Sequence, residues 1–322
     1  MMCSIRFFEL TLPVDTEDFN KLLDRAYRRT RKSGRVYEAD FGHADESLLS
    51  EGIGIAYHGD SKKKKIRFVI HPASVIDKDG TDDLWEPTSG NIKRLIGKLD
   101  KLIGSYFQSD YELSDLILNR VDFAVDVDVG SKDKVSDYIK ILHNIRKVRY
   151  FSPIKPNKRD GTTKDSFFGL AGNTNGIEFY AYRIKDAKRL LRVEIRLTSK
   201  DVIKGYSGDV STDDQIKVLA ENGDRVFMET FKYIVPPGNY LKKSKVDKII
   251  WEKIKDTTLR YKMIKLVTLI PEKKSLHLAI KAFKSKDIKE VMAGFAELGV
   301  SPVTIAKRHE RKELPSLYSY LE

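Results

Sequence analysis

The sequence predicts an α+β protein in which two related helix-backed antiparallel sheet units form a central curved sheet, followed by a mostly helical C-terminal region. Two observations predict this fold. An order of one strand, one helix and several further strands occurs twice within the first 200 residues. Beyond about residue 200 the apolar residues keep helical spacing only. We therefore expect a first unit over residues 1–110, a second over 111–200 that carries the active site, and a helical region over 201–322.

The first unit reads as a strand, a helix, three short strands, a loop and a second helix. Asp15 and Thr16 are suited to cap the first helix, because their side-chain oxygens accept hydrogen bonds from its free amides. Pro72 has no amide hydrogen and therefore ends the last strand. The expected ranges are 5–12 for the first strand, 35–39, 52–58 and 65–71 for the three short strands, 77–90 for the loop, and 91 onward for the second helix.

The second unit repeats this order, and the helical region closes with two helices. Gly299 is placed to adopt the left-handed conformation that ends a helix. Ser301 is then placed to cap the next helix, and Pro302 to be its first residue. A plain pair of helices and a DNA-reading helix-turn-helix fit this pattern about equally. The expected ranges are 116–129 for a strand, 134–146 for a helix, 166–170, 176–183 and 190–198 for three strands, and 288–298 and 302–309 for the closing helices.

Basic residues exceed acidic ones by 59 to 47 in the 322-residue chain, which gives a net charge of +12. Residues 241–290 hold 15 Lys and Arg against 6 Asp and Glu, and smaller basic clusters occur at residues 25–35 and 62–65. Such surfaces attract polyphosphates through counterion release. A solvated helical face and, less well supported, an anionic lipid surface are the alternatives. The candidate DNA-binding residues are Arg28, Arg29, Arg31, Lys62, Lys63, Lys64, Lys242, Lys243 and Lys245.

Several classes of protein are excluded. Cys3 is the single cysteine, so there is neither an internal disulfide framework nor a zinc site built from cysteines. The histidines lack metal-binding spacing, and neither a P-loop nor a Ser or Cys nucleophile elbow occurs. No stretch approaches the roughly 18 uninterrupted apolar residues of a membrane helix, and no signal-peptide pattern begins the chain. We expect a soluble cytoplasmic protein with no membrane partner.

Three predicted strands each carry one apolar face and one ionisable face, because side chains alternate along a strand. A sheet with one face in water explains such alternation. However, Asp is disfavoured in strands, and acids two residues apart repel one another unless cations lie among them. A Mg²⁺ or Mn²⁺ site and a structural network of arginines and carboxylates both meet this need, and we favour the metal. The polar faces hold Arg120, Asp122, Ala124, Asp126 and Asp128; Glu178, Tyr180 and Tyr182; and Arg192, Glu194 and Arg196.

The tyrosines on these faces suggest the chemistry. A tyrosyl oxygen attacks a phosphodiester and forms a covalent intermediate when a metal ion or an arginine stabilises the developing charge. Tyr180 and Tyr182 are the candidate nucleophiles.

The order of three motifs resembles the replication initiators of filamentous phages and of certain rolling-circle plasmids. The motifs are R-x-D-x-A-x-D at residues 120–126, S-F-F-G-x-x-G-N-T-N-x-I-x-F-Y-x-Y-x-x-K at 166–185 and L-R-x-E-x-R-L at 191–197. Residues 296–317, with L-G-V-S-P at 298–302, are also similar to the phage branch.

The resemblance implies an enzyme that recognises a replication origin, nicks one strand through a tyrosine, holds the 5′-phosphate covalently and leaves a 3′-hydroxyl for the host polymerase. It also implies a divalent metal, a host helicase as partner, and a bacterial cell whose phage, plasmid or integrated element encodes the protein. A homodimer is left open, and a conjugative relaxase would share this chemistry.

The resemblance implies roles for particular residues of this sequence. Ala181 or Arg183 stands where the family has an acid, which motivates the alternative of a noncatalytic DNA-binding protein on the same scaffold. The implied roles are Tyr180 or Tyr182 as nucleophile, Asp122, Asp126 and Glu194 as ligands of Mg²⁺ or Mn²⁺, and Arg120, Arg192 and Lys185 as cations that neutralise the scissile phosphate.

Overall fold

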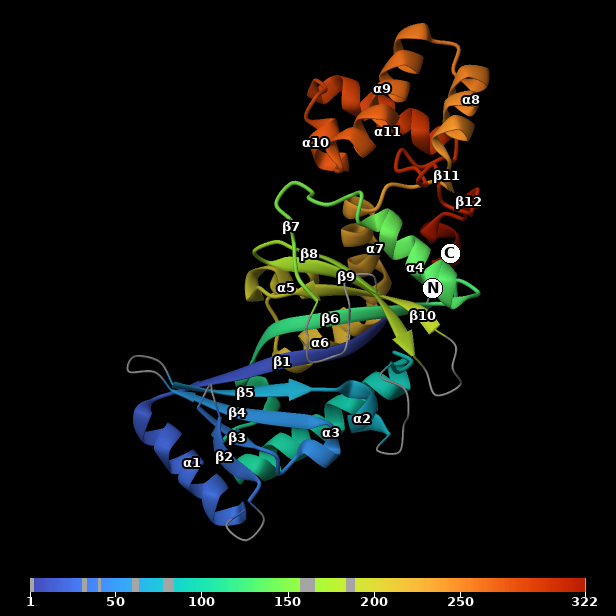
Figure 1. Ribbon diagram of the computed structural model, residues 1–322. Coiled ribbons are helices and arrows are strands. Elements are labelled where there is room, and N and C mark those ends of the chain that lie inside the picture. Colours follow the sequence, from blue (N-terminus) through green and yellow to red (C-terminus); the bar gives the residue numbers. More distant parts are fainter. Residues whose placement is uncertain are drawn as a thin grey trace. The chain divides into compact units, whose positions relative to one another are not determined.

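The computed structural model describes residues 3–30, 34–39, 42–59, 64–77, 84–156, 166–183 and 189–321 of a mixed α+β protein (Figure 1), the predicted class. The chain forms two compact units that interleave along the sequence. We call Met2–Ala124 with Arg196–Phe227 the N-terminal unit, and Val125–Ile195 with Met228–Glu322 the C-terminal unit. They do not follow the consecutive segments 1–110, 111–200 and 201–322, because two strands, β6 (Ile117–Val127) and β10 (Arg189–Leu197), contribute residues to both units.

The N-terminal unit is built on strands in the order β2-β3-β4-β5-β1-β6, and each described pair is antiparallel. The long strand β1 lies between β5 and β6, where its register pairs Thr11 with Arg67 and Glu9 with Arg120. The bounds are β1 Ser4–Val14, β2 Val36–Ala39, β3 Gly42–Asp45, β4 Ile53–Gly59 and β5 Lys64–Ile70.

One face of these strands forms the core. Phe68 on β5 and Tyr57 on β4 are fully buried, and helices cover them. Phe19 of α1 meets the Tyr57 ring edge-on at 5.8 Å, and Phe107 of α3 meets Phe68 at 5.7 Å. Because side chains alternate, Glu9, Arg67 and Arg120 lie on the opposite face. The helices of this unit are α1 Thr16–Thr30, α2 Pro72–Ile76, α3 Ser89–Phe107, α5 Lys200–Ser207 and α6 Thr212–Glu221 (Figure 1).

The C-terminal unit continues β6 and adds strands in the order β6-β10-β9-β8-β7. Phe179 of β9 is fully buried between Phe168 of β8 and Phe231 of α7, with ring centroids 5.9 and 6.2 Å away. Helix α7 begins in the N-terminal unit and ends in this one. The bounds are α4 Lys132–Leu142, β7 Ser152–Pro153, β8 Phe167–Ala171, β9 Asn175–Arg183 and α7 Gly223–Ile234.

The rest of the C-terminal unit is mainly helical, as predicted. The short strands β11 and β12 pair, and four helices lie between them in the sequence. The bounds are β11 Tyr240–Leu241, α8 Lys243–Lys253, α9 Thr257–Lys273, α10 Leu276–Ile280, α11 Ser285–Glu297 and β12 Glu313–Leu314.

The predicted closing helix over residues 302–309 is wrong, and so is the helix-turn-helix. Helix α11 does end before a left-handed Gly299, with φ +63°. The chain then bends at Pro302 and Val303 and makes isolated parallel bridges at Val300 and Ile305, where Ile305 donates its amide hydrogen to the carbonyl of Leu241. Val303 and Ile305 are 0% and 2% exposed. Burial of these two β-branched residues in an irregular segment overrides the helix-start signal of Ser301 and Pro302.

Several short elements were not predicted, among them α2 and β3. Pro72 was expected only to end a strand, but it is also the first residue of α2, where a missing amide hydrogen costs nothing. Strand β3 begins at Gly42, whose φ of +128° and closeness to the Tyr57 carbonyl admit only glycine. Among the described helices, none combines the length and apolar character needed to cross a membrane.

Candidate functional site

The polar face of the N-terminal unit carries a network of arginines and carboxylates. Asp122 is fully buried, and Arg120 binds both of its oxygens, at 2.8 and 2.7 Å. Arg196 adds a bond of 3.0 Å to Asp122 Oδ2. Glu9 lies between Arg67, at 2.9 and 2.5 Å, and Arg120, at 3.2 Å. The predicted polar face therefore exists, but its central acid is buried rather than in water.

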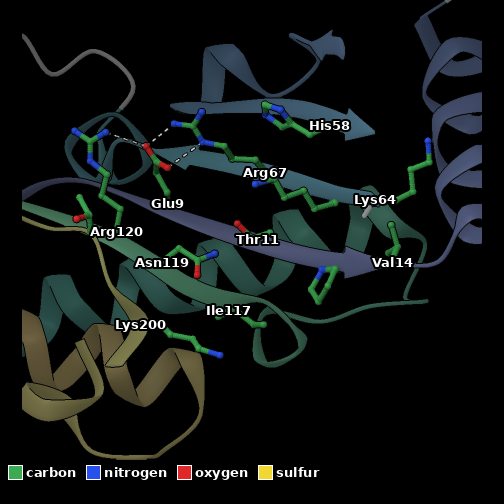
Figure 2. A pocket seen from close by; sticks show the side chains of 13 residues that line it. Glu9, Thr11, Val14, His58, Lys64, Arg67, Ile117, Asn119, Arg120 and Lys200 are labelled. Atoms are coloured by element: carbon green, nitrogen blue, oxygen red, sulfur yellow. Dashed lines mark hydrogen bonds and ion pairs between the residues drawn. The ribbon is translucent and has the colours of Figure 1, made fainter. Parts of the chain in front are cut away.

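A groove of about 880 Å³ opens beside this network. Its walls come from β1, β4, β5, β6 and the start of α5, and Figure 2 shows the Glu9 carboxylate between the guanidinium groups of Arg67 and Arg120. The lining residues are Glu9, Thr11, Pro13, Val14, His58, Lys64, Lys65, Arg67, Ile117, Asn119, Arg120, Thr198 and Lys200.

The groove is strongly basic. Five Lys and Arg side chains line it, against one acid, Glu9, among the lining residues that the structure describes. Arg67 and Arg120 already pair with Glu9. Burial and the nearby charges of Lys65 and Arg67 lower the pKa of His58 from its ordinary value, against a smaller opposing effect of Glu9. Lys65 and Lys200 are exposed. A concave surface with this charge attracts an extended anion such as a nucleic-acid backbone.

The C-terminal unit carries the tyrosines. Tyr180 on β9 donates a hydrogen bond to Oε1 of Glu194 on β10. Arg192, two residues before Glu194, binds both oxygens of Asp126 at 2.6 and 2.7 Å. The Arg192 guanidinium carbon also lies 3.5 Å from the centre of the Tyr182 ring. The structure therefore brings together all five predicted residues of this unit that it describes with side chains.

Burial sets the chemistry of this cluster, which we call the tyrosine cluster: Asp126, Tyr180, Tyr182, Arg192 and Glu194. Arg192 is 1% exposed and Glu194 is 3% exposed. Burial alone would lower the pKa of Arg192, but the hydrogen bond and charge of Asp126, with both tyrosines, raise it above its ordinary value. Arg192 therefore stays charged, and its field at the tyrosines is stronger than it would be in water.

The predicted carboxylates do not fit a metal centre as they are arranged. Asp122 and Asp126 each have both oxygens bound by an arginine, and Glu194 accepts from Tyr180. An arginine cannot lose its proton to make room for a cation. Within the described parts of the chain, no group of three or more His, Cys, Asp or Glu side chains is placed to hold a metal ion. The structure thus matches the alternative reading of a structural network of arginines and carboxylates.

The other basic candidates lie in varied surroundings. Arg28 is exposed at the end of α1, whereas the Arg29 guanidinium stacks 4.2 Å from the Tyr106 ring and donates to the Tyr106 carbonyl. Lys243 pairs with Asp247 at 2.6 Å and Lys245 with Glu313 at 2.5 Å. Lys64 lines the groove, Lys242 donates to the carbonyl of Lys307, and Arg31, Lys62, Lys63 and Lys185 lie outside the described residues.

Sequence reasoning missed part of the groove. Arg67 and Lys65 alternate with buried Ile66 and Phe68, so the period of two along β5 already indicated a basic face. His58 and Lys200 carried no comparable signal, because strand pairing and the turn into α5 bring them to the groove.

Comparisons with known proteins do not assign the chain. No family model matches it, and neither does any curated protein. A solved structure described as a conserved protein of unknown function from Enterococcus faecalis is similar over 36% of this chain and 87% of its own, with 12% identity and a TM-score of 0.19. A likeness at that score carries no weight for fold or function.

Proposed function

We propose that this chain is a DNA nicking and joining enzyme, a replication initiator that acts through a tyrosine. The observation that carries the proposal is the hydrogen bond from the Tyr180 hydroxyl to the Glu194 carboxylate. In covalent catalysis a nucleophile is activated by a general base within hydrogen-bond distance, and the buried Glu194 carboxylate has that position beside Tyr180. Tyr180 is favoured over Tyr182, whose ring packs against the Arg192 guanidinium.

In the proposed reaction the Tyr180 oxygen attacks the phosphorus of a phosphodiester while its proton passes to Glu194. The bond from phosphorus to the 3′ oxygen breaks, the departing 3′ oxygen takes up one proton from water, and Glu194 gives up the tyrosine proton to water. The products are a 5′-phosphotyrosine, a free 3′-hydroxyl and the original Glu194 carboxylate, with no net gain or loss of protons. Attack by a 3′-hydroxyl on the phosphotyrosine reverses these changes and joins the strand.

Arg192 supplies positive charge for the crowded phosphate of the transition state. Asp126 holds the guanidinium through two hydrogen bonds, which fixes its orientation before substrate binds. The Mg²⁺ or Mn²⁺ ion stays a prediction. Arginines bind Asp122 and Asp126, and Tyr180 donates to Glu194, so the carboxylates proposed as metal ligands already have partners.

The test is a covalent-adduct assay. Purified protein is incubated with Mn²⁺ and a supercoiled plasmid that carries the DNA flanking its own gene, then examined on a denaturing gel. The expected result is a protein–DNA band that Tyr180→Phe abolishes and the matched Tyr182→Phe variant retains. Undiminished adduct in Tyr180→Phe would refute the assignment, and loss in Tyr182→Phe alone would transfer it to that residue.

A noncatalytic DNA-binding protein is the second candidate, and the basic groove favours it, since the groove requires only an anionic backbone. Salt-sensitive DNA binding without any adduct, beside a working positive control, would select this reading. The first proposal also includes a host helicase as partner and leaves a homodimer open. It further proposes that a phage, plasmid or integrated element of a bacterial cell encodes the protein.

A further inference from the structure

Helices α8 and α9 carry a pair of exposed aromatic rings that the proposed reaction does not use. Trp251 on α8 and Tyr261 on α9 are 50% and 60% exposed. Their ring centroids are 6.1 Å apart, and the planes are inclined at 78°. The two rings therefore form an open corner on the surface of the C-terminal unit.

Arg260 connects the two helices beside these rings. The Arg260 guanidinium lies 4.7 Å from the centre of the Trp251 ring. Its Nε and one terminal nitrogen both donate to the carbonyl oxygen of Ile254, at 2.9 and 2.6 Å. Ile254 follows α8, and Arg260 lies in the first turns of α9, so these bonds tie the two helices together at the rings.

The surroundings are basic. Residues 243–274 contain ten Lys and Arg against four Asp and Glu. Three of the four acids are engaged: Asp247 pairs with Lys243, Glu252 pairs with Lys248 at 3.7 Å, and Asp256 caps α9 by accepting from the Leu259 amide at 2.8 Å. Lys253 and Lys255 are exposed on either side of Ile254.

From these features we infer that the corner formed by Trp251, Arg260 and Tyr261 binds unpaired bases of a single-stranded nucleic acid. Aromatic rings stack on the face of any base, and lysines beside them neutralise the phosphates, a combination typical of sequence-tolerant single-strand binding. A base stacked on one ring presents its edge to the other, because the rings are nearly perpendicular. An apolar protein partner would gain nothing from the surrounding positive charge.

Tryptophan fluorescence tests the inference directly. The chain has two tryptophans, and the other, Trp85, is 6% exposed and donates its indole hydrogen to the Ile5 carbonyl. Oligothymidine of 15 nucleotides is added to the Tyr180→Phe protein, so that the result does not depend on nicking. We expect quenching of Trp251 emission that saturates, persists in Trp85→Phe and weakens with salt. Absence of quenching under conditions where the oligonucleotide binds would overturn the inference.

Affinities measured by anisotropy of labelled oligothymidine separate stacking from charge. Trp251→Ala and Tyr261→Ala should each weaken binding about 5- to 100-fold, whereas Trp251→Phe should restore most of it. Tyr37→Ala serves as the matched control, because Tyr37 is also exposed, at 44%, and lies in the other unit. Equal affinity of wild type and Trp251→Ala, or equal binding of a duplex of the same length, would contradict a base-stacking site.

Discussion

Tyr180 on β9 donates its hydroxyl hydrogen to Glu194 on the neighbouring strand β10, at a site where Glu194 is 3% exposed. A buried carboxylate that accepts this bond is placed to take the proton when the phenol attacks a phosphate. This relationship joins two residues that the alternation of their strands had already assigned to one polar face.

Replacing the proposed base should slow the reaction while leaving substrate binding intact. General-base catalysis contributes about 100- to 10,000-fold, so Glu194→Gln should lower the single-turnover rate of adduct formation by at least about 100-fold. The amide keeps the size of the side chain and can still accept from Tyr180. Glu178→Gln, on the same strand as Tyr180, is the control. Equal rates for Glu194→Gln and wild type would remove Glu194 from the mechanism.

Breaking the buried ion pair of the tyrosine cluster should destabilise the protein. Asp126→Ala leaves the Arg192 charge, which is 1% exposed, without its carboxylate, and loss of one partner from a buried pair costs about 3–5 kcal/mol. Urea unfolding followed by circular dichroism measures the change. Asp209→Ala removes a surface pair with Lys204, in which Asp209 is 84% exposed, and should leave the unfolding midpoint unchanged. An unchanged midpoint in Asp126→Ala would contradict the structural role.

The groove should bind DNA mainly through charge. Lys65→Ala and Lys200→Ala should each reduce the slope of log affinity against log salt by about 1, and should do so equally for unrelated DNA sequences. Lys140→Ala is the control, because Lys140 is exposed on α4 and does not line the groove. If both groove variants keep the wild-type slope, the DNA backbone does not contact these lysines.

DNA binding in the groove should strengthen in acid. His58 has a pKa lowered below its ordinary value of 6.5 by burial and by Lys65 and Arg67, while Glu9 opposes the shift. The imidazole is therefore neutral at pH 7 and gains charge only as the pH falls through that lowered pKa. A bound phosphate favours the charged form, so affinity at pH 5.5 should exceed affinity at pH 8. His58→Gln should reduce this difference, and an identical pH profile would show that His58 does not face the ligand.

The sequence could predict strands better than the sites that they build. Alternation in β6, β9 and β10 correctly separated apolar from polar faces, because burial of one face imposes a period of two. It could not show that Asp122 is buried beneath Arg120 and Arg196, since that depends on which strands pair. The carboxylates were expected to hold a metal because the repulsion among them is visible in the sequence. Arg120 lies on the same strand as Asp122, but Arg192 and Arg196 bind Asp126 and Asp122 from the neighbouring strand β10, and the sequence does not show that pairing.

In the C-terminal helical region the sequence predicted a local element that tertiary packing does not allow. Gly299 follows the end of α11 as predicted, but Val303 and Ile305 are buried in an irregular segment, so the local helix signals are overridden by tertiary burial. Trp251 and Tyr261, ten residues apart on different helices, become neighbours only through the packing of α8 against α9.

The most direct measurement is the identity of the residue that carries the DNA. The covalent adduct is isolated, digested with nuclease and protease, and analysed by tandem mass spectrometry for a peptide with a phosphotyrosyl nucleotide. The proposed mechanism predicts the modification on Tyr180, in a peptide of strand β9. A modification on any other residue, or an adduct that forms equally in Tyr180→Phe, would contradict it.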